Sequence, residues 1–221
     1  FKNYVNLFAN EELRNMILGT VALAFVTATI STVLATFGAI GAFYSKKLPK
    51  TLLNTANRIP VVNADIVTGF SICILIIIIL RVDKDTFIPL GIGHVVLTAP
   101  FVYLSILPKL KQMDNSLYEA ALDLGATPAQ ALFKVVIPQL IPGILSGFIL
   151  AVTLSLDDYF VTTYTKPSTF DTISTYVVNA TKGSQTEVKT ALWALSTLIF
   201  LIVIAAVVIM NVLGRRKEKS K

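Results

Sequence analysis

The chain has 221 residues, of which 54% are hydrophobic and only 14% are charged, and its net charge is +6. A mean hydropathy of +0.72 leaves too little polar surface for a soluble domain, and it excludes intrinsic disorder as well. A single cysteine excludes a disulfide scaffold. The basic residues are not gathered on a folded polar domain, so nucleic acid is not expected as a partner.

Apolar stretches predict an all-α membrane protein with five spans in one transmembrane domain over residues 1–221. A helix needs about 20 residues to cross the hydrocarbon core of the lipid bilayer. The second stretch is long enough only if its helix begins near Val61, with Asn63 and Asp65 in the first turn. In chain order we place the spans at about 15–44, 61–80, 87–108, 139–163 and 189–213.

Charge predicts the orientation of these spans. The side that holds residues 46–60, residues 109–138 and the C-terminal tail carries 12 basic and four acidic residues, whereas the other side carries seven basic and six acidic residues. Basic loops stay in the cytoplasm, so we expect the N-terminus outside and the C-terminus in the cytoplasm. Residues 1–14 lack a signal-peptide pattern. We therefore expect a preceding span that is removed, unresolved or on a separate chain, with a natural outside N-terminus as the alternative.

The cytoplasmic segment 109–138 is too long for a simple turn, and it carries helix signals. Ser116 to Glu119 fits a capping box, Gly125 is suited to end the helix, and a second capping box starts at Thr127 with Pro128 behind it. Two short helices with a bend between them are predicted. Their apolar positions at helical spacing are Leu117, Ala120, Ala121 and Leu124.

This pattern allows two interpretations. An amphipathic hairpin lying on the lipid surface is one of them. The alanines Ala120 and Ala121 favour the other, a low ridge that enters a groove of a partner protein, because a helix on the lipid surface gains by inserting bulky side chains.

The same segment resembles the EAA loop of ABC-importer permease subunits. The matching residues are Glu119-Ala120-Ala121, Gly125, Ala126, Phe133, Val136, Pro138 and Pro142-Gly143. The resemblance implies the fold of a type I ABC importer transmembrane subunit, in which Glu119 to Leu124 insert into a cytoplasmic ATPase subunit, Gly125 forms the bend and Thr127 to Phe133 connect to the next span. It also implies that ATP and Mg²⁺ bind to the partner ATPase dimer. This chain has no G-x-x-x-x-G-K-[ST] motif, so we expect it to hold no cofactor and to be no enzyme.

The sequence Ser155-Leu156-Asp157-Asp158-Tyr159 places two acids in the outer part of the fourth span, where charge is costly. On a continuous helix Asp157 and Asp158 point about 100° apart, with Thr153 on the face of Asp157 and Ser155 on that of Asp158. One interpretation is structural: an aspartate caps a broken helix or pairs with a basic residue of another subunit. In the other, at least one aspartate attracts a cationic solute, and Tyr159 or Tyr164 offers a cation–π contact.

Ser-Leu-Asp-Asp at this distance from the EAA loop is similar to the spermidine/putrescine (PotC-type) permease subunits. Such subunits usually have six spans, and we expect the first to be the one missing here. The resemblance implies a subunit in the plasma or bacterial inner membrane that pairs with a second homologous permease subunit and receives a polyamine from an extracytoplasmic binding protein. It also assigns a predicted surface helix over residues 171–182 to the contact with that protein, although the helix could simply pack on the bundle.

Two other hypotheses stay open. One is an ABC permease for another small solute, such as an organic anion or a metal chelate, and the other is a membrane scaffold that transports nothing. His94 has no second histidine in the chain, which favours a hydrogen-bonded core residue, and Cys73 is expected to be a buried small residue.

Overall fold

A computed structural model describes residues 11–45, 51, 54–114 and 116–182, together with the single positions 197, 201 and 204. This described part of the chain is helical and contains no strand. It divides into two compact units, one made of Phe1–Thr20 with Asp171–Lys221 and the other of Val21–Phe170. The fifth predicted span, 189–213, lies outside the described residues except for positions 197, 201 and 204.

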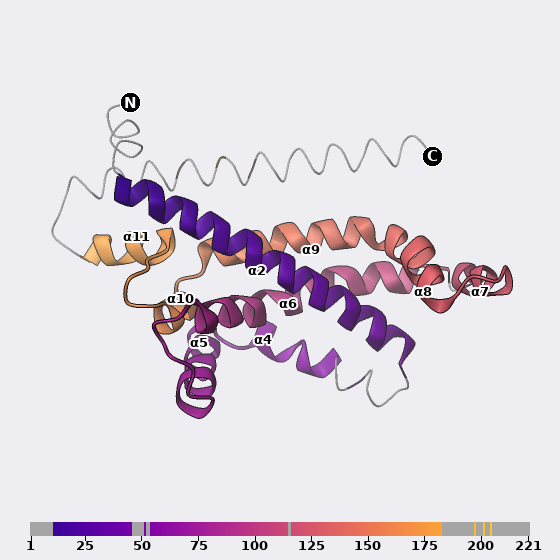
Figure 1. The fold of residues 1–221 in the computed structure, drawn as a ribbon, viewed down its shortest axis with the longest axis horizontal. Helices are drawn as coiled ribbons and strands as arrows, with labels where there is room; N and C mark the ends of the chain where they lie inside the picture. The colour runs from indigo at the N-terminus through magenta and orange to yellow at the C-terminus, as the bar shows by residue number, and fades with distance from the viewer. Residues whose placement is uncertain are drawn as a thin grey trace. The chain divides into compact units, whose positions relative to one another are not determined.

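Three helical stretches of the described chain are long and apolar enough to cross a membrane: Leu13–Tyr44, Phe87–Gln112 and Pro128–Asp157. They fall on the first, third and fourth predicted spans. A shorter apolar stretch, Asp65–Ile79, falls on the second. The elements in chain order (Figure 1) are α2 (Glu11–Tyr44), α4 (Ile59–Val62), α5 (Asp65–Cys73), the π-helix η1 (Ile74–Ile79), α6 (Phe87–Gln112), α7 (Ser116–Asp123), α8 (Pro128–Ala131), the π-helix η2 (Leu132–Val136), α9 (Ile137–Asp157), α10 (Phe160–Thr165) and α11 (Ile173–Lys182).

Two predicted spans are interrupted rather than continuous. In the second, Ala64 has an extended backbone (φ −66°, ψ 137°), so the helix starts at Asp65 and not near Val61. In the fourth, α9 ends at Asp157, and Asp158 is extended (φ −67°, ψ 124°) before α10 begins at Phe160. Both breaks fall at polar residues, Asn63 and Asp65 in the second span and Asp157 and Asp158 in the fourth.

From Val21 onward, α2 has small residues inside and bulky residues outside. A bilayer accepts bulky apolar side chains on the outer surface, whereas small residues let neighbouring helices approach closely. The buried small residues include Ala24, Ala28, Ala35 and Ala39. The exposed bulky residues include Phe25, Val26, Ile30, Val33, Leu34 and Phe37.

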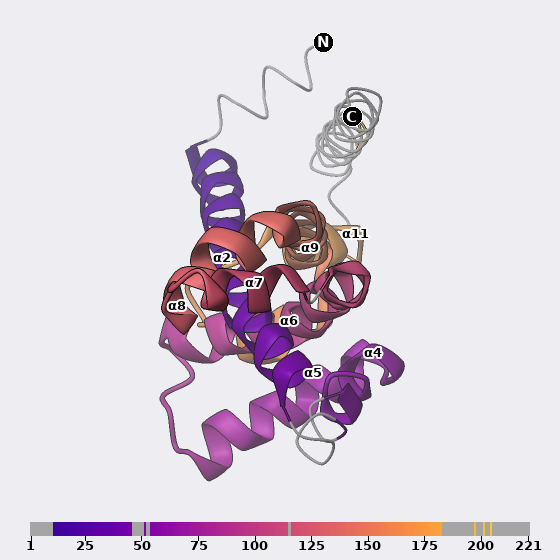
Figure 2. The same cartoon turned by 90° about the vertical axis from the view of Figure 1, so that its right-hand side faces the viewer.

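Helices α6 and α9 pack side by side along a stripe of small buried residues on α9 (Figure 2). The stripe repeats every four residues: Gly143, Gly147, Ala151 and Ser155. A Cβ atom on Gly147 would lie 2.8 Å from Cγ1 of Val102, and one on Gly143 would lie 3.0 Å from Cγ of Lys109. Both separations are shorter than van der Waals contact, so the crossing depends on glycine at these two positions.

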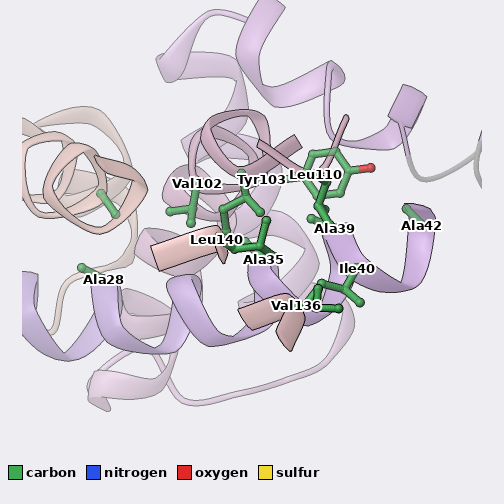
Figure 3. Packing of buried hydrophobic residues seen from close by; sticks show 12 residues of the cluster. Ala28, Ala35, Ala39, Ile40, Ala42, Val102, Tyr103, Leu110, Val136 and Leu140 are labelled. Carbon is green, nitrogen blue, oxygen red and sulfur yellow. The ribbon is translucent and has the colours of Figure 1, made fainter. Parts of the chain in front are cut away.

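The buried apolar cluster of this unit joins α2, α6, η2 and α9 (Figure 3). Tyr103 of α6 is its largest member, and its hydroxyl group donates to Oδ1 of Asn54 at 2.7 Å. The labelled members in Figure 3 are Ala28, Ala35, Ala39, Ile40, Ala42, Val102, Tyr103, Leu110, Val136 and Leu140.

In the other unit, the surface helix predicted over residues 171–182 is present as α11. Its first turn is capped by hydroxyl groups: the Thr172 N–H donates to Oγ1 of Thr175 at 3.0 Å, and the Thr175 hydroxyl donates to Oδ1 of Asp171 at 3.0 Å. The Ile173 N–H donates to Oγ1 of Thr20 at 3.1 Å, which ties α11 to the start of α2. Contact of α11 with a binding protein stays a prediction.

Candidate functional site

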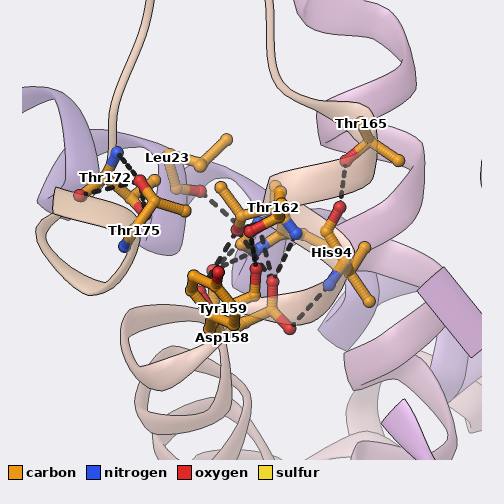
Figure 4. A network of polar contacts seen from close by, with 12 residues as sticks. Leu23, His94, Asp158, Tyr159, Thr162, Thr165, Thr172 and Thr175 are labelled. Atoms are coloured by element: carbon orange, nitrogen blue, oxygen red, sulfur yellow. Dashed lines mark hydrogen bonds and ion pairs between the residues drawn. The ribbon is translucent and has the colours of Figure 1, made fainter. Parts of the chain in front are cut away.

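Asp158 lies in the break between α9 and α10, and its carboxylate accepts three hydrogen bonds (Figure 4). Oδ1 accepts the Val161 N–H at 3.2 Å, and Oδ2 accepts both the N–H and the hydroxyl of Thr162 at 2.7 Å. The first turn of a helix has free N–H groups, which a negative charge satisfies. Asp158, which is 8% exposed, therefore caps α10.

His94 of α6 joins this cap to α9. Its Nε2 lies 3.0 Å from Oγ1 of Thr162 and 3.8 Å from Oδ2 of Asp158, while its Nδ1 lies 2.7 Å from Oγ of Ser155. Because the Thr162 hydroxyl donates to Asp158, it accepts from Nε2–H, and Nδ1 then accepts the Ser155 hydroxyl. The fully buried His94 is a hydrogen-bonded core residue, as predicted.

Helix α2 adds two hydroxyl groups to this polar network. Oγ1 of Thr27 lies 3.3 Å from Oγ of Ser155, and Oγ of Ser31 lies 2.6 Å from Oγ1 of Thr98. The Thr98 hydroxyl donates to the His94 carbonyl at 2.8 Å, which leaves Ser31 as the donor to Thr98. We did not predict Thr27 and Ser31 from the sequence, although hydroxyl residues spaced along the small-residue face of α2 were a visible signal.

The residues predicted for a substrate pathway have two different surroundings. Ser155 and Asp158 are buried in the polar network. Asp157, the last residue of α9, is exposed, and Thr153 one turn before it is half-buried. Tyr159 is also half-buried, with its ring centroid 5.3 Å from that of Phe160. The break in the helix thus separates the surroundings of the two aspartates.

The bend predicted after the first short helix of segment 109–138 is confirmed. Gly125 has φ +86°, in the left-handed region that favours glycine. Its N–H donates to the carbonyl of Leu122 at 2.9 Å, and the Ala126 N–H donates to the carbonyl of Ala121 at 3.0 Å. These two bonds form a Schellman motif, which satisfies carbonyl groups at the end of α7.

The second predicted capping box is confirmed as well. The Gln130 N–H donates to Oγ1 of Thr127 at 3.3 Å, the Thr127 N–H donates to Oε1 of Gln130 at 2.9 Å, and Pro128 is the first helical residue. The start of α7 differs from the prediction, because Ser116 is already helical and donates its N–H to Oδ1 of Asp114 at 2.9 Å. That hydrogen bond lowers the pKa of Asp114 below the usual aspartate value.

Helix α7 and the residue after it, Leu124, present an exposed apolar ridge, and no residue of α7 is fully buried. Leu124 is 89% exposed and Leu117 is 44% exposed, and Ala120 between them is exposed too. Glu119 is exposed, whereas Ala121 is half-buried. The other side of α7 faces its own chain, since Tyr118 packs against the apolar cluster. The ridge can therefore bind a partner without moving α7 away from the membrane helices.

The family described as "Binding-protein-dependent transport system inner membrane component" matches residues 36–219. The chain belongs to this family. It is therefore an all-α, multi-pass permease subunit of an ABC transporter in the inner membrane, and a subunit of this kind is not itself an enzyme. Within the described ranges, the permease has no group of three or more His, Cys, Asp or Glu residues that could hold a metal ion.

The permease also resembles individual proteins, at modest sequence identity. It is 28% identical over 216 residues to the spermidine/putrescine transport system permease protein PotC of Haemophilus influenzae. The aligned region covers 97% of this chain and 82% of that protein. It is 28% identical over 207 residues to the putrescine transport system permease protein PotI of Escherichia coli strain K12, which covers 89% and 70%. The crystal structure of an amino acid ABC transporter with histidines has a TM-score of 0.67 at 18% identity, over 96% of the permease and 98% of that chain. The last likeness supports the fold alone.

Proposed function

We propose that this permease subunit moves a polyamine, such as spermidine or putrescine, that an extracytoplasmic binding protein delivers. The observation that carries the proposal is an exposed acid, Asp157, at the end of α9 in a chain whose relatives include permease proteins named for polyamines. A polyamine carries several ammonium groups at neutral pH. A carboxylate on its path can replace part of their hydration and lower the barrier to crossing the membrane.

The two aspartates then have different tasks. Asp157 attracts the cation, with Thr153 and Tyr159 beside it on the pathway. Asp158 and Ser155 shape the pathway from inside, because three donors already surround the Asp158 carboxylate and a solute cation would have to displace them. Asp158 thus acts through the geometry of the α9–α10 break.

The energy for transport would come from an ATPase dimer that binds ATP and Mg²⁺. In this proposal the ATPase receives the ridge of α7 through Ala120 and Leu124, with Glu119 and Ala121 beside them. Gly125, Thr127 and Pro128 hold the bend behind it, so closure of the ATPase dimer displaces α7 and α8 as one stiff piece. A second homologous permease subunit completes the path, which opens alternately to each side of the membrane.

The orientation belongs to the same proposal. The charge distribution favours α7 and the C-terminus in the cytoplasm and the N-terminus outside. The bulky outer residues of α2, such as Val26 and Ile30, would then face lipid or the second permease subunit.

ATP-driven uptake of labelled spermidine into vesicles that contain the reconstituted transporter tests the proposal. We expect Asp157→Asn to lower uptake by about tenfold or more at low spermidine concentration, because one charge contact in a poorly hydrated path is lost. Asp83→Asn is the matched control, since Asp83 is an exposed acid in the loop before α6, and it should transport like the wild type.

The outcome separates the alternatives. Full uptake by Asp157→Asn would remove the carboxylate from the proposal. ATP-driven uptake of an organic anion or a metal chelate in place of spermidine would identify a permease for another solute. A complete complex that transports nothing would favour the scaffold.

A further inference from the structure

Two aromatic contacts join α2 to segment 109–138. The ring of Tyr44, the last residue of α2, lies against the ring of Tyr118 in α7, with centroids 5.2 Å apart and planes at 39°. Two turns earlier, Phe37 meets Phe133 of η2 nearly edge-on, with centroids 6.4 Å apart and planes at 68°. Ring pairs at these separations attract each other. Helix α2 is therefore in contact with both the first and the last part of the segment.

The Tyr118 contact matters because the other main contacts of α7 are with η2 and α8, its neighbours in the same segment. No residue of α7 is fully buried, and Tyr118 is the residue of this helix that packs against the apolar cluster. Phe43 and Met113 pack against the same cluster, so the attachment of α7 lies where α2 and α6 end. A displacement of α7 must strain or move this attachment.

Helix α2 can transmit such a displacement over a long distance. It is continuous from Glu11 to Tyr44 and contains no proline. From Tyr44 to Thr27 there are 17 residues, or about 25 Å along the axis. At that distance Thr27 contacts Ser155, and Ser31 contacts Thr98, within the network around Asp158.

We propose that α2 is a second mechanical link between α7 and the Asp158 network. Movement of α7 passes to α2 through Tyr118–Tyr44 and Phe133–Phe37, in parallel with the covalent route through α8, η2 and α9. With one route alone, α9 could swing while α2 stayed in place. With both routes, Ser155 of α9 and its α2 neighbour Thr27 move together. The inference rests on the proposed function, in which an ATPase displaces α7.

The test uses the complete transporter in vesicles, and it measures solute uptake and ATP hydrolysis in the same preparation. In Tyr118→Leu and in Tyr44→Leu we expect the ATPase to remain bound, because the exposed ridge of α7 is unchanged. The amount of solute moved per ATP should fall about threefold or more, as expected for loss of one aromatic contact from the link. The double variant should be no worse than either single variant, because both remove the same contact.

Three controls keep the test independent of folding defects. Tyr118→Phe and Tyr44→Phe keep both rings and should retain the wild-type ratio of uptake to hydrolysis. Phe25→Leu removes another ring from α2, one whose partner Phe148 lies outside segment 109–138, and it should also retain the ratio. Phe133→Leu removes the second contact and should lower the ratio in its own right.

The outcomes are distinguishable. A wild-type ratio in Tyr118→Leu, Tyr44→Leu and Phe133→Leu would overturn the inference and leave the proposed function intact. Additive losses in the Tyr44/Tyr118 double variant, or loss of the ATPase from Tyr118→Leu, would overturn it too. A wild-type transporter that neither retains an ATPase nor moves solute would overturn the proposed function itself.

Discussion

Replacing Asp158 by asparagine tests whether this aspartate is a cap or a solute ligand. The carboxylate presents an acceptor oxygen to each donor group, Oδ1 to the Val161 N–H and Oδ2 to the N–H and hydroxyl of Thr162. An amide has only one acceptor oxygen. If that oxygen takes the place of Oδ2, the NH₂ group faces the Val161 N–H and leaves it without an acceptor.

The expected loss of stability is the sum of three free-energy contributions. An orphaned buried N–H costs about 1–3 kcal/mol, and each of the two remaining bonds weakens by roughly 1 kcal/mol when its acceptor loses its charge. Removal of a buried charge relieves a desolvation penalty, which opposes both terms. We therefore expect Asp158→Asn to lower the free energy of unfolding by about 1–3 kcal/mol, or roughly 3–10 °C in melting temperature for a domain of this size.

The assay is thermal unfolding of the purified complex, with spermidine uptake measured on the same variants. Thr162→Val removes the hydroxyl donor to Asp158 with little change of shape, so its effect and that of Asp158→Asn should be less than additive. A variant Asp158→Asn that melts like the wild type but no longer transports would refute the capping role and would make Asp158 a ligand of the solute.

Three further predictions concern packing, the bend and pH. Gly147→Ala should destabilise the permease by about 1–2 kcal/mol, because the added Cβ clashes with Val102. The control Gly91→Ala has no atom within 4 Å of the added Cβ and should be neutral or stabilising by up to about 1 kcal/mol. Equal melting temperatures of the two variants would contradict the close α6–α9 crossing. Gly125→Ala should cost about 1–2 kcal/mol of backbone strain and reduce uptake per ATP. Gly125→Asn should lose less uptake per ATP than Gly125→Ala, because asparagine tolerates positive φ. Equal uptake per ATP in Gly125→Ala and the wild type would contradict a stiff bend. The backbone N–H and hydroxyl of Ser168 hold the pKa of Asp85 below its usual value. The contact between the two loops therefore contributes stability above the unfolded pKa of Asp85, and this stability is lost as the pH falls through the lower folded pKa, below about pH 4. Hydrogen exchange of the Ser168 amide should accelerate in that pH range relative to loops without acids, and Asp85→Asn should abolish the acceleration.

The sequence predicted most of the elements of segment 109–138 because their signals are local. A capping box at Thr127 depends on residues three apart, and the left-handed turn at Gly125 depends on one residue. Long apolar stretches similarly predicted the helices that became α2, α6 and α9. Signals of this kind are complete within a few turns of the chain.

The polar network could not be predicted in the same way, because its partners lie far apart in sequence. Asp158 and Thr162 are neighbours, but His94 reaches them across 64 or more residues, and Thr27 reaches Ser155 across 128. The break after Asp157 falls at two adjacent acids, a signal that allowed either a capped break or a solute ligand, and the sequence alone did not decide between them. The contact between Tyr44 and Tyr118 belongs to the same class. Only tertiary structure brings such residues together.

In the proposed transporter, the ridge of α7 binds an ATPase. A photo-reactive amino acid in place of Leu124, which is 89% exposed, tests it most directly in membranes that contain the complete transporter. The matched position is Leu145 of α9, which is 53% exposed on a membrane-spanning helix. We predict that position 124 crosslinks to the ATPase subunit in a nucleotide-dependent manner and that position 145 does not. Crosslinks from position 124 to lipid alone would contradict binding of the ATPase by the ridge.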